Sequence, residues 1–196
     1  INLSKFITDS SSGKKIEDPE RSRTSIPLST TLSANRMGRR IDWDSMRDVI
    51  HTSIHFLDNV LDMNEYPVEE IARMTALIRR VGLGVMGWAD MLVKLEIGYD
   101  TKEAFDLAEK VMKFVQKEAD NASCDLAKTR GVFPGFKGSI YDKPARNATH
   151  SVAGGKGEIK PRNGARTTIA PTGTISLLAD CSSGIEPHFA LTYAKN

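Results

Sequence analysis

The segment with the clearest chemical potential is TTIAPTGTISLLAD, residues 167–180. Its β-branched residues predict a short strand over 167–170, Pro171-Thr172-Gly173 predicts a tight turn, and a short helix is expected over 174–179. The start of a helix offers backbone N–H groups without partners and the positive end of the helix dipole, so it can bind a phosphate without a lysine. An ordinary strand-to-helix turn with a threonine cap gives the same pattern, and the residues alone leave both interpretations open.

Glycine and hydroxyl residues make this turn a candidate phosphate site. Gly173 would let the backbone approach an anion closely, and Thr172, Thr174 and Ser176 would add hydroxyl donors. No lysine follows Gly173 and the GxxxxGK[ST] spacing is absent, so the segment is not a Walker loop. The full predicted set is Ala170, Pro171, Thr172, Gly173, Thr174, Ile175 and Ser176.

A second glycine pattern, GLGVMG at residues 82–87, formally matches the GxGxxG of dinucleotide sites. Such a site follows a strand and has an acidic residue about 20 positions later on the next strand. Here the pattern follows a predicted helix, and the acidic residues at that distance, Glu103 and Asp106, fall on another. Close packing between helices is the favoured interpretation, and an NAD-dependent dehydrogenase is the weaker alternative.

His51 and His55 stand four residues apart, a spacing that can bind a metal from one helix face. Thr52 occupies the position of the zincin glutamate, and no third ligand is evident, although Asp58 or Asp62 could join. A solvated helix face with His–Asp pairs is the favoured interpretation, so no metal site is predicted.

Three isolated residues complete the candidates. Glu186 lies between Gly184 and Pro187, where it is either a site-lining carboxylate or a turn carboxylate that accepts backbone N–H bonds. Cys124 and Cys181 form no CxxC pair, so neither a zinc site nor a disulfide framework is indicated. Both are expected to be packing residues, in a chain that fits a reducing compartment.

Most elements around these candidates are expected to be helical. Apolar residues at helical spacing predict a first helix over 43–63, with Asp44, Asp48, Asp58 and Asp62 mostly off its apolar stripe. Three more helices are expected: from Pro67 to Arg80, from Val85 to Leu95, and from a capping box at Asp100 and Glu103 to Gly131.

Strands and irregular segments occupy the rest of the chain. Short strands are expected over 1–8 and 189–193, while polar residues 9–40 predict a loop or insertion and residues 131–166 an irregular connection. Strands separated by long helices favour an α/β architecture.

Composition narrows the class of protein. The 196 residues are 40% hydrophobic and 27% charged, typical of one globular domain or a large part of one. A net charge of +2 is too small for an electrostatic nucleic-acid surface, and no apolar run approaches the length of a membrane span. The start Ile1-Asn2-Leu3 is not that of a signal peptide, and the chain is expected to be cut from a longer one.

TTIAPTGTIS followed by SSGIEPHFAL resembles the large, catalytic subunits of ribonucleotide reductases, in the C-terminal half of their ten-stranded α/β barrel. The resemblance extends to four upstream segments: INLSKFI, IDWDSMRDVIHTSIHFLDNVLDMNEYP, RRVGLGVMGWADMLVKL and LAEKVMKFVQKEA. It covers most of the chain apart from residues 9–40 and about 143–161. The motifs are most similar to the adenosylcobalamin-dependent class II, with a class I metal-radical subunit as the alternative.

This resemblance implies a fold and a site. The fold would be α/β, a helix-rich part of the ten-stranded barrel, with residues 1–196 a partial catalytic barrel domain and residues 143–166 an irregular connection. The turn at 171–176 would hold the substrate's phosphates, with Arg162, Asn163 and Glu186 lining the site. Arg146-Asn147-Ala148-Thr149 looks like a second copy of the RNAT-like element at 162–167, and GxGxxG would serve barrel packing.

The resemblance also implies an activity, the replacement of the ribose 2′-hydroxyl by hydrogen through a thiyl radical, for deoxyribonucleotide biosynthesis and DNA replication. The radical cysteine of this family lies in an Asn-x-Cys-x-Glu motif that this chain does not contain, so no catalytic residue is assigned here and the segment alone should be inactive. Implied partners are a ribonucleoside di- or triphosphate, a thioredoxin-type reductant and a second copy in a homodimer, without nucleic acid or membrane, in the cytoplasm. The alternative is a non-catalytic nucleotide- or phosphate-binding fragment.

Overall fold

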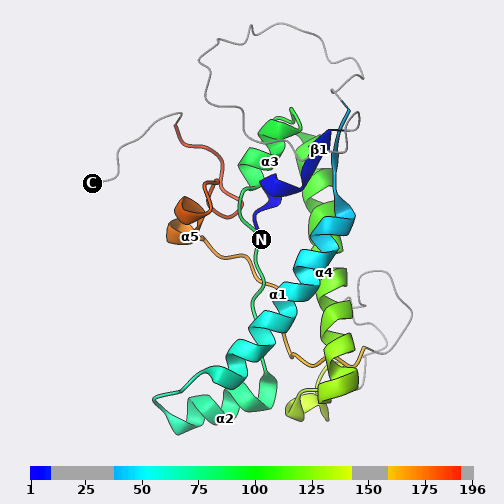
Figure 1. Ribbon diagram of the computed structural model, residues 1–196, viewed down its shortest axis with the longest axis vertical. Helices are drawn as coiled ribbons and strands as arrows, with labels where there is room; N and C mark the ends of the chain where they lie inside the picture. Colours follow the sequence, from blue (N-terminus) through cyan, green and yellow to red (C-terminus); the bar gives the residue numbers. More distant parts are fainter. Residues whose placement is uncertain (10–37, 143–158, 191–196) are drawn as a thin grey trace, which may run out of the picture. The chain divides into compact units, whose positions relative to one another are not determined.

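A computed structural model describes residues 1–9, 38–142 and 159–190 (Figure 1). Arg146-Asn147-Ala148-Thr149, most of the predicted loop at 9–40 and the end of the predicted strand at 189–193 lie outside these residues. The chain divides into two compact units, which are described separately. The first comprises Ile1, Asp44–Val85 and Phe105–Ala170, and the second Asn2–Trp43, Met86–Ala104 and Pro171–Asn196.

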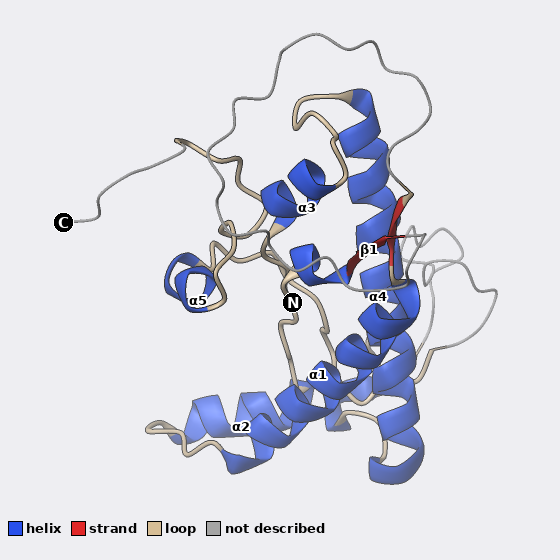
Figure 2. Cartoon of the chain, turned by 45° about the horizontal axis from the view of Figure 1, so that its top comes forward, coloured by secondary structure: helices blue, strands red, loops and turns tan. Residues whose placement is uncertain are grey.

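Two long helices, α1 (Trp43–Met63) and α4 (Lys102–Arg130), lie side by side and form most of the first unit (Figure 2). Their core is built from residues spaced four apart, which fall on one helix face. Met46, Ile50 and Ile54 of α1 are fully buried, as are Val115 and Ala119 of α4. Burial of an isoleucine or methionine side chain stabilises the fold by about 1.5–3 kcal/mol. The predicted bounds of α1 are confirmed.

The ends of α4 follow from two residues. Gly131, with a φ of 78°, ends the helix in the left-handed conformation, as predicted. At the start, Thr101 Oγ1 accepts a hydrogen bond from Ala104 N at 3.3 Å, so Thr101 takes the capping role expected of Asp100.

Helix α2 (Glu69–Ile78) begins two residues later than expected from Pro67. It places Glu69 and Glu70 in its first turn, where their negative charges interact favourably with the positive end of the helix dipole. It ends at Ile78, two residues before the predicted end at Arg80. Its C-cap is Arg79, a non-glycine residue in the left-handed conformation (φ 50°) whose N–H donates to Thr75 O at 2.7 Å. Such a conformation costs about 1–2 kcal/mol, which the contacts of the Arg79 side chain must offset.

Residues 81–84 are extended and run parallel to residues 165–168. Leu83 N donates to Arg166 O at 2.8 Å, and Thr168 N donates to Leu83 O at 3.0 Å. A Cβ on Gly82 would lie 3.0 Å from Thr168 Cγ2, and one on Gly84 would lie 3.1 Å from Thr168 O. Gly82 and Gly84, the first two glycines of GxGxxG, therefore permit close approach of two extended segments, and the prediction of helix–helix packing is wrong for them.

The extended path also changes two predicted elements. Helix α3 (Trp88–Lys94) begins three residues after the predicted start at Val85, because residues 81–84 are extended. The strand predicted over 167–170 is reduced to one parallel bridge between Leu83 and Thr167.

The second unit begins with a 3₁₀ turn, η1 (Leu3–Phe6), where a strand over 1–8 was expected. The Asn2 side chain accepts a hydrogen bond from Ser4 N at 3.1 Å and so starts the turn. A short antiparallel pair follows, β1 (Ile7–Asp9) with β2 (Arg39–Ile41), in which Thr8 faces Arg40.

The core of this unit lies where η1 packs on α3: its buried side chains are Leu3, Phe6, Trp88, Met91 and Leu92. Helix α5 (Gly173–Leu178) starts one residue before its predicted position. Phe189 and Ala190, the described part of the predicted final strand, are in no strand, so that prediction is wrong there. Within the described residues, no helix is long and apolar enough to cross a membrane.

Candidate functional site

The turn before α5 has the geometry of an uncapped helix start. Thr172 is the N-cap in the left-handed conformation (φ 55°, ψ 29°), and its O accepts the first helical bond from Ser176 N at 2.9 Å. The amides of Gly173, Thr174 and Ile175 therefore have no acceptor inside the helix. The Thr172 side chain does not cap them, because its Oγ1 accepts from Gly184 N at 2.7 Å. Among the described residues, these three helix-start amides therefore have no acceptor.

Space and exposure around the turn suit an approaching ligand. A Cβ on Gly173 would meet no described atom within 4 Å, and Gly173, Thr174 and Ile175 are all exposed. Ser176 differs from the prediction, because it is buried and its Oγ lies 2.8 Å from Ser183 Oγ and donates to Gly173 O at 3.1 Å. Of the three predicted hydroxyl donors, Ser176 donates within the protein, whereas Thr172 only accepts, from Gly184 N, so Thr172 and Thr174 keep a hydroxyl hydrogen to donate.

The other predicted site residues are divided between the two units. Ala170, Arg162 and Asn163 belong to the first unit, whereas Pro171–Ser176 and Glu186 belong to the second. Glu186 is exposed, and its N–H donates to Ser183 O at 3.0 Å. Its role as a site-lining residue stays a prediction.

Arg162 and Asn163 are part of a buried polar network in the first unit. Asn163 is fully buried; its side chain accepts from Ser123 Oγ at 2.8 Å and donates to Asp58 Oδ1 at 2.9 Å. Arg162 Nη1 donates to Arg130 O at 3.0 Å. Their described bonds thus serve the packing of the network, and their predicted role in lining the site is untested.

Asp58 is the centre of this network. It is 0% exposed and accepts hydrogen bonds from Arg79 at 2.8 and 3.1 Å, from Arg130 at 3.0 Å and from Asn163. Burial works against its ionisation, but the hydrogen bonds from Arg79, Asn163 and Arg130 outweigh it and lower the pKa of Asp58. These contacts also hold Arg79 in its left-handed conformation.

Sequence reasoning missed this centre, because it placed Asp58 mostly off the apolar stripe and beside the histidines. The sequence did contain a pattern that indicates burial of Asp58, because Asp58 follows Met46, Ile50 and Ile54 at the same spacing of four. A carboxylate in line with buried residues indicates a buried ion pair.

A second buried pair fixes the segment that leads to Ala170. Arg166 Nε donates to Asp120 Oδ1 at 2.6 Å, and both residues are buried. Burial raises the pKa of Asp120, and Arg166 opposes that rise. Arg166 Nη1 also donates to Tyr141 Oη at 3.0 Å, so residue 166 is anchored on two sides.

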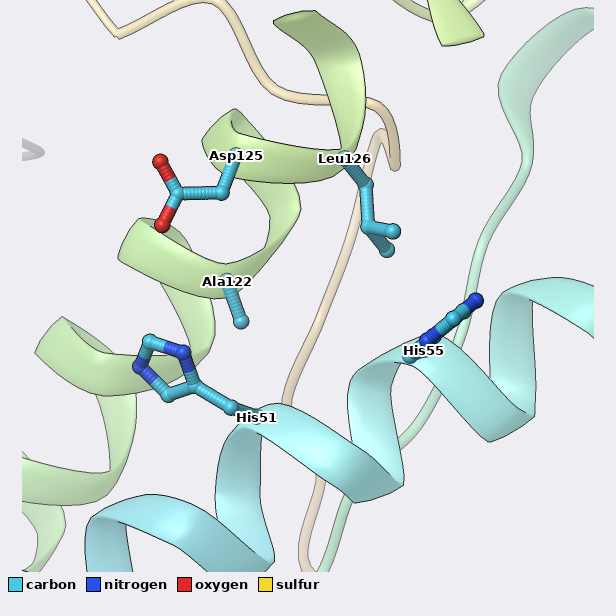
Figure 3. A pocket seen from close by; sticks show the side chains of 5 residues that line it. All are labelled: His51, His55, Ala122, Asp125 and Leu126. Carbon is cyan, nitrogen blue, oxygen red and sulfur yellow. The ribbon is translucent and has the colours of Figure 1, made fainter. Parts of the chain in front are cut away.

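The two histidines at a metal-binding spacing, His51 and His55, line a pocket of about 230 Å³ between α1 and α4 (Figure 3). His51 Nε2 lies 3.1 Å from Glu118 Oε2, and His55 Nε2 lies 2.9 Å from Arg130 Nη2. Their partners are therefore not the expected Asp58 and Asp62. In the part of the chain that the structure describes, no group of three His, Cys, Asp or Glu residues could hold a metal ion.

The cysteines have the environment of structural thiols. Burial raises the pKa of the Cys124 thiol, and burial together with the nearby Asp90 carboxylate raises that of Cys181. Reactive cysteines need the opposite shift, toward the thiolate.

Comparison with known proteins gives a consistent result. The family model described as ribonucleotide reductase, barrel domain, matches residues 1–196. The chain is 48% identical over 159 residues to the vitamin B12-dependent ribonucleoside-diphosphate reductase of Thermoplasma acidophilum, covering 81% of this chain and 19% of the relative. It is 40% identical over 156 residues to the Mycobacterium tuberculosis protein of the same name, covering 80% and 20%. The alpha subunit of the Chlamydia trachomatis ribonucleoside-diphosphate reductase is 31% identical over 192 residues, covering 86% and 18%.

Proposed function

This chain belongs to the ribonucleotide reductase family, whose barrel-domain model matches its whole length, and we propose that the full-length protein converts ribonucleotides to 2′-deoxyribonucleotides. The chain spans about a fifth of the length of the relatives above, so the activity is assigned to the whole protein. The thiyl-radical chemistry is assigned to residues outside this chain, because the Asn-x-Cys-x-Glu motif is not in it. To this chain we assign the binding of the substrate's phosphates and a part of the barrel that surrounds the active site.

We propose that the turn at 171–176 binds the phosphates of the substrate. The observation that carries this proposal is the engagement of Thr172 Oγ1 by Gly184 N, which leaves the amides of Gly173, Thr174 and Ile175 without a cap. Backbone amides at a helix start favour an anion both by hydrogen bonding and by the helix dipole. The names of the relatives in Thermoplasma and Mycobacterium specify a ribonucleoside diphosphate, and we propose that substrate class here.

We further propose that the chain forms part of the ten-stranded α/β barrel, as one partial domain over 1–196. The parallel pairing of residues 81–84 with 165–168 supports this proposal, because barrel strands are parallel neighbours separated by helices. On this proposal the insertion predicted over 9–40 lies between β1, which contains Asp9, and β2, which contains Arg39 and Arg40, and the connection predicted over 143–166 leads into the second of these extended segments.

Adenosylcobalamin is the cofactor that we propose for the full-length protein, because the relatives in Thermoplasma and Mycobacterium are named as vitamin B12-dependent. Among the described residues, no group of three His, Cys, Asp or Glu residues could hold a metal ion. His51 contacts Glu118, His55 contacts Arg130, and His188 contacts Asp90, so each described histidine has a protein partner. We therefore assign the cofactor to no residue of this chain. The thioredoxin-type reductant, the homodimer and the cytoplasmic location stay predictions.

The test of the phosphate turn is Gly173→Val in the full-length reductase. A Cβ at this position would meet no described atom within 4 Å, so we expect the variant to fold, and we expect the branched side chain to obstruct the approach of a phosphate to the amides. Loss of a hydrogen bond to a charged group costs about 1.5–3 kcal/mol, so KM for the ribonucleoside diphosphate should rise roughly tenfold or more. Leu178→Val, at the exposed far end of the same helix, is the control for a β-branched residue. An unchanged KM in Gly173→Val would refute the site.

A further inference from the structure

Helix α3 is capped by a residue from a distant part of the second unit. Its N-cap is Gly87, which has no side chain, and Gly87 N donates to Ser182 O at 2.8 Å. Ser182 Oγ accepts from Asp90 N at 3.4 Å, while Asp90 Oδ2 accepts from Ser182 N at 2.6 Å. This reciprocal pair is that of a capping box, with the serine supplied from 92 residues away.

The two residues after Ser182 contact the candidate phosphate turn. Ser183 Oγ lies 2.8 Å from Ser176 Oγ, and Gly184 N donates to Thr172 Oγ1 at 2.7 Å. Gly184 is buried with a φ of 47°, a conformation that strains a residue with a side chain. Residues 182–184, which we call the bridge segment, thus connect the start of α3 to the start of α5.

The bridge segment keeps the Thr172 hydroxyl away from the amides of the turn. A threonine at an N-cap normally turns its hydroxyl toward the amides of the first helical turn. Here the Thr172 hydroxyl accepts from Gly184 N instead, and the Thr172 backbone is left-handed (φ 55°), not extended as at a usual N-cap. If the bridge segment moved away, the hydroxyl would be free to compete with a phosphate for the same amides.

We propose that Asp90 is a positioning residue for the phosphate-binding turn. This inference rests on the proposed function of that turn. Asp90 holds Ser182 by the shortest bond of the capping pair, and its second oxygen lies 3.0 Å from His188 Nε2, six residues further along the same segment. One carboxylate therefore fixes both ends of the segment 182–188 against α3. Asp90 makes no hydrogen bond to the turn at 171–176, all of which the structure describes, and acts on it through Ser183 and Gly184.

The experiment uses Asp90→Ala in the full-length reductase, with inorganic pyrophosphate as the probe of the phosphate site. KM for the ribonucleoside diphosphate and Ki for pyrophosphate should both rise about three- to tenfold, equal to about 0.6–1.4 kcal/mol, while kcat stays within about twofold. A merely structural loss would reduce the amount of active enzyme without changing the pyrophosphate Ki. Asp90→Asn keeps an oxygen for Ser182 N and should recover most of the affinity. Asp100→Ala, an exposed carboxylate of the same unit, is the control.

Two further variants separate the outcomes. Ser183→Ala removes one hydroxyl from the bridge segment, so it tests the step from that segment to the turn if Asp90→Ala does not fold; a raised pyrophosphate Ki supports that step, and an unchanged one overturns the inference, because Asp90 is proposed to act through this segment. If Gly173→Val raises KM and Ki while Asp90→Ala and Ser183→Ala change neither, Asp90 has no positioning role and the turn remains the site. If Gly173→Val has no effect, the proposed function is wrong and this inference falls with it.

Discussion

Replacement of Asp58 by asparagine tests whether the buried network holds the first unit together. Asp58 is fully buried and accepts bonds from Arg79, Arg130 and Asn163. Asparagine keeps the shape but removes the charge and one acceptor, so Arg79 loses its buried counterion. Breaking a buried ion pair costs about 3–5 kcal/mol, and we expect the lower end, because Arg79 retains Asp62 at 2.7 Å.

Hydrogen exchange in the full-length protein measures this loss locally. The amides to follow are those of Asn163, bonded to Ser123 Oγ at 3.0 Å, and Gly164, bonded to Ile78 O at 2.9 Å. A loss of about 3 kcal/mol should accelerate their exchange about a hundredfold, since each 1.4 kcal/mol is a factor of about ten.

Asp62→Asn is the matched control, because Asp62 is the other carboxylate on Arg79. Its side chain is 51% exposed, and exposed ion pairs contribute only about 0–1 kcal/mol, so exchange should change less than about fivefold. Equal exchange rates in the two variants would refute the view that Asp58 is the centre of the network.

Two further predictions concern the close strand approach and acid stability. Gly84→Ala places a Cβ 3.1 Å from Thr168 O and should destabilise the protein by about 1–3 kcal/mol. Its thermal midpoint should therefore be lower than that of the control Gly173→Ala, whose Cβ meets no described atom within 4 Å. Equal midpoints in the two variants would contradict the packing argument. The pKa of Asp58 is lowered by folding, so its contribution to stability is present above the ordinary carboxyl value of about 3.9 and is lost as the pH falls through the lower folded value. Circular dichroism during acid titration should therefore show a shallower loss of structure below about pH 4 in Asp58→Asn, and an unchanged slope would contradict the assignment.

Local patterns predicted the long helices and the family well. The bounds of α1 follow from apolar residues that repeat every four positions. The end of α4 follows from Gly131 alone, because this glycine adopts the left-handed conformation that terminates a helix. The family resemblance, drawn from motifs such as TTIAPTGTIS and SSGIEPHFAL, is confirmed by the match over 1–196. These features depend on residues close together in the sequence.

Features that depend on distant partners were missed. Asp58 meets Arg79 after 21 residues and Asn163 after 105, so no local pattern shows that the carboxylate is paired and buried. Residues 1–8 alternate like a strand, but the Asn2 side chain starts a 3₁₀ turn instead. The turn at 171–176 was recognised, whereas the use of Thr172 Oγ1 by Gly184 was not, because it depends on the path of a later loop.

The distant cap of α3 has a consequence for synthesis on the ribosome. α3 is a seven-residue helix, too short to persist in water, and Ser182 is translated 92 residues after Asp90. At about 5–20 residues per second, the nascent helix waits roughly 5–20 seconds for its cap. The first unit faces the same delay, because Asp58 is made 105 residues before Asn163. Both units are therefore completed only when the segment 162–188 has left the ribosome, and until then Asp58 lacks one of its partners and Trp88 lies in an uncapped first turn.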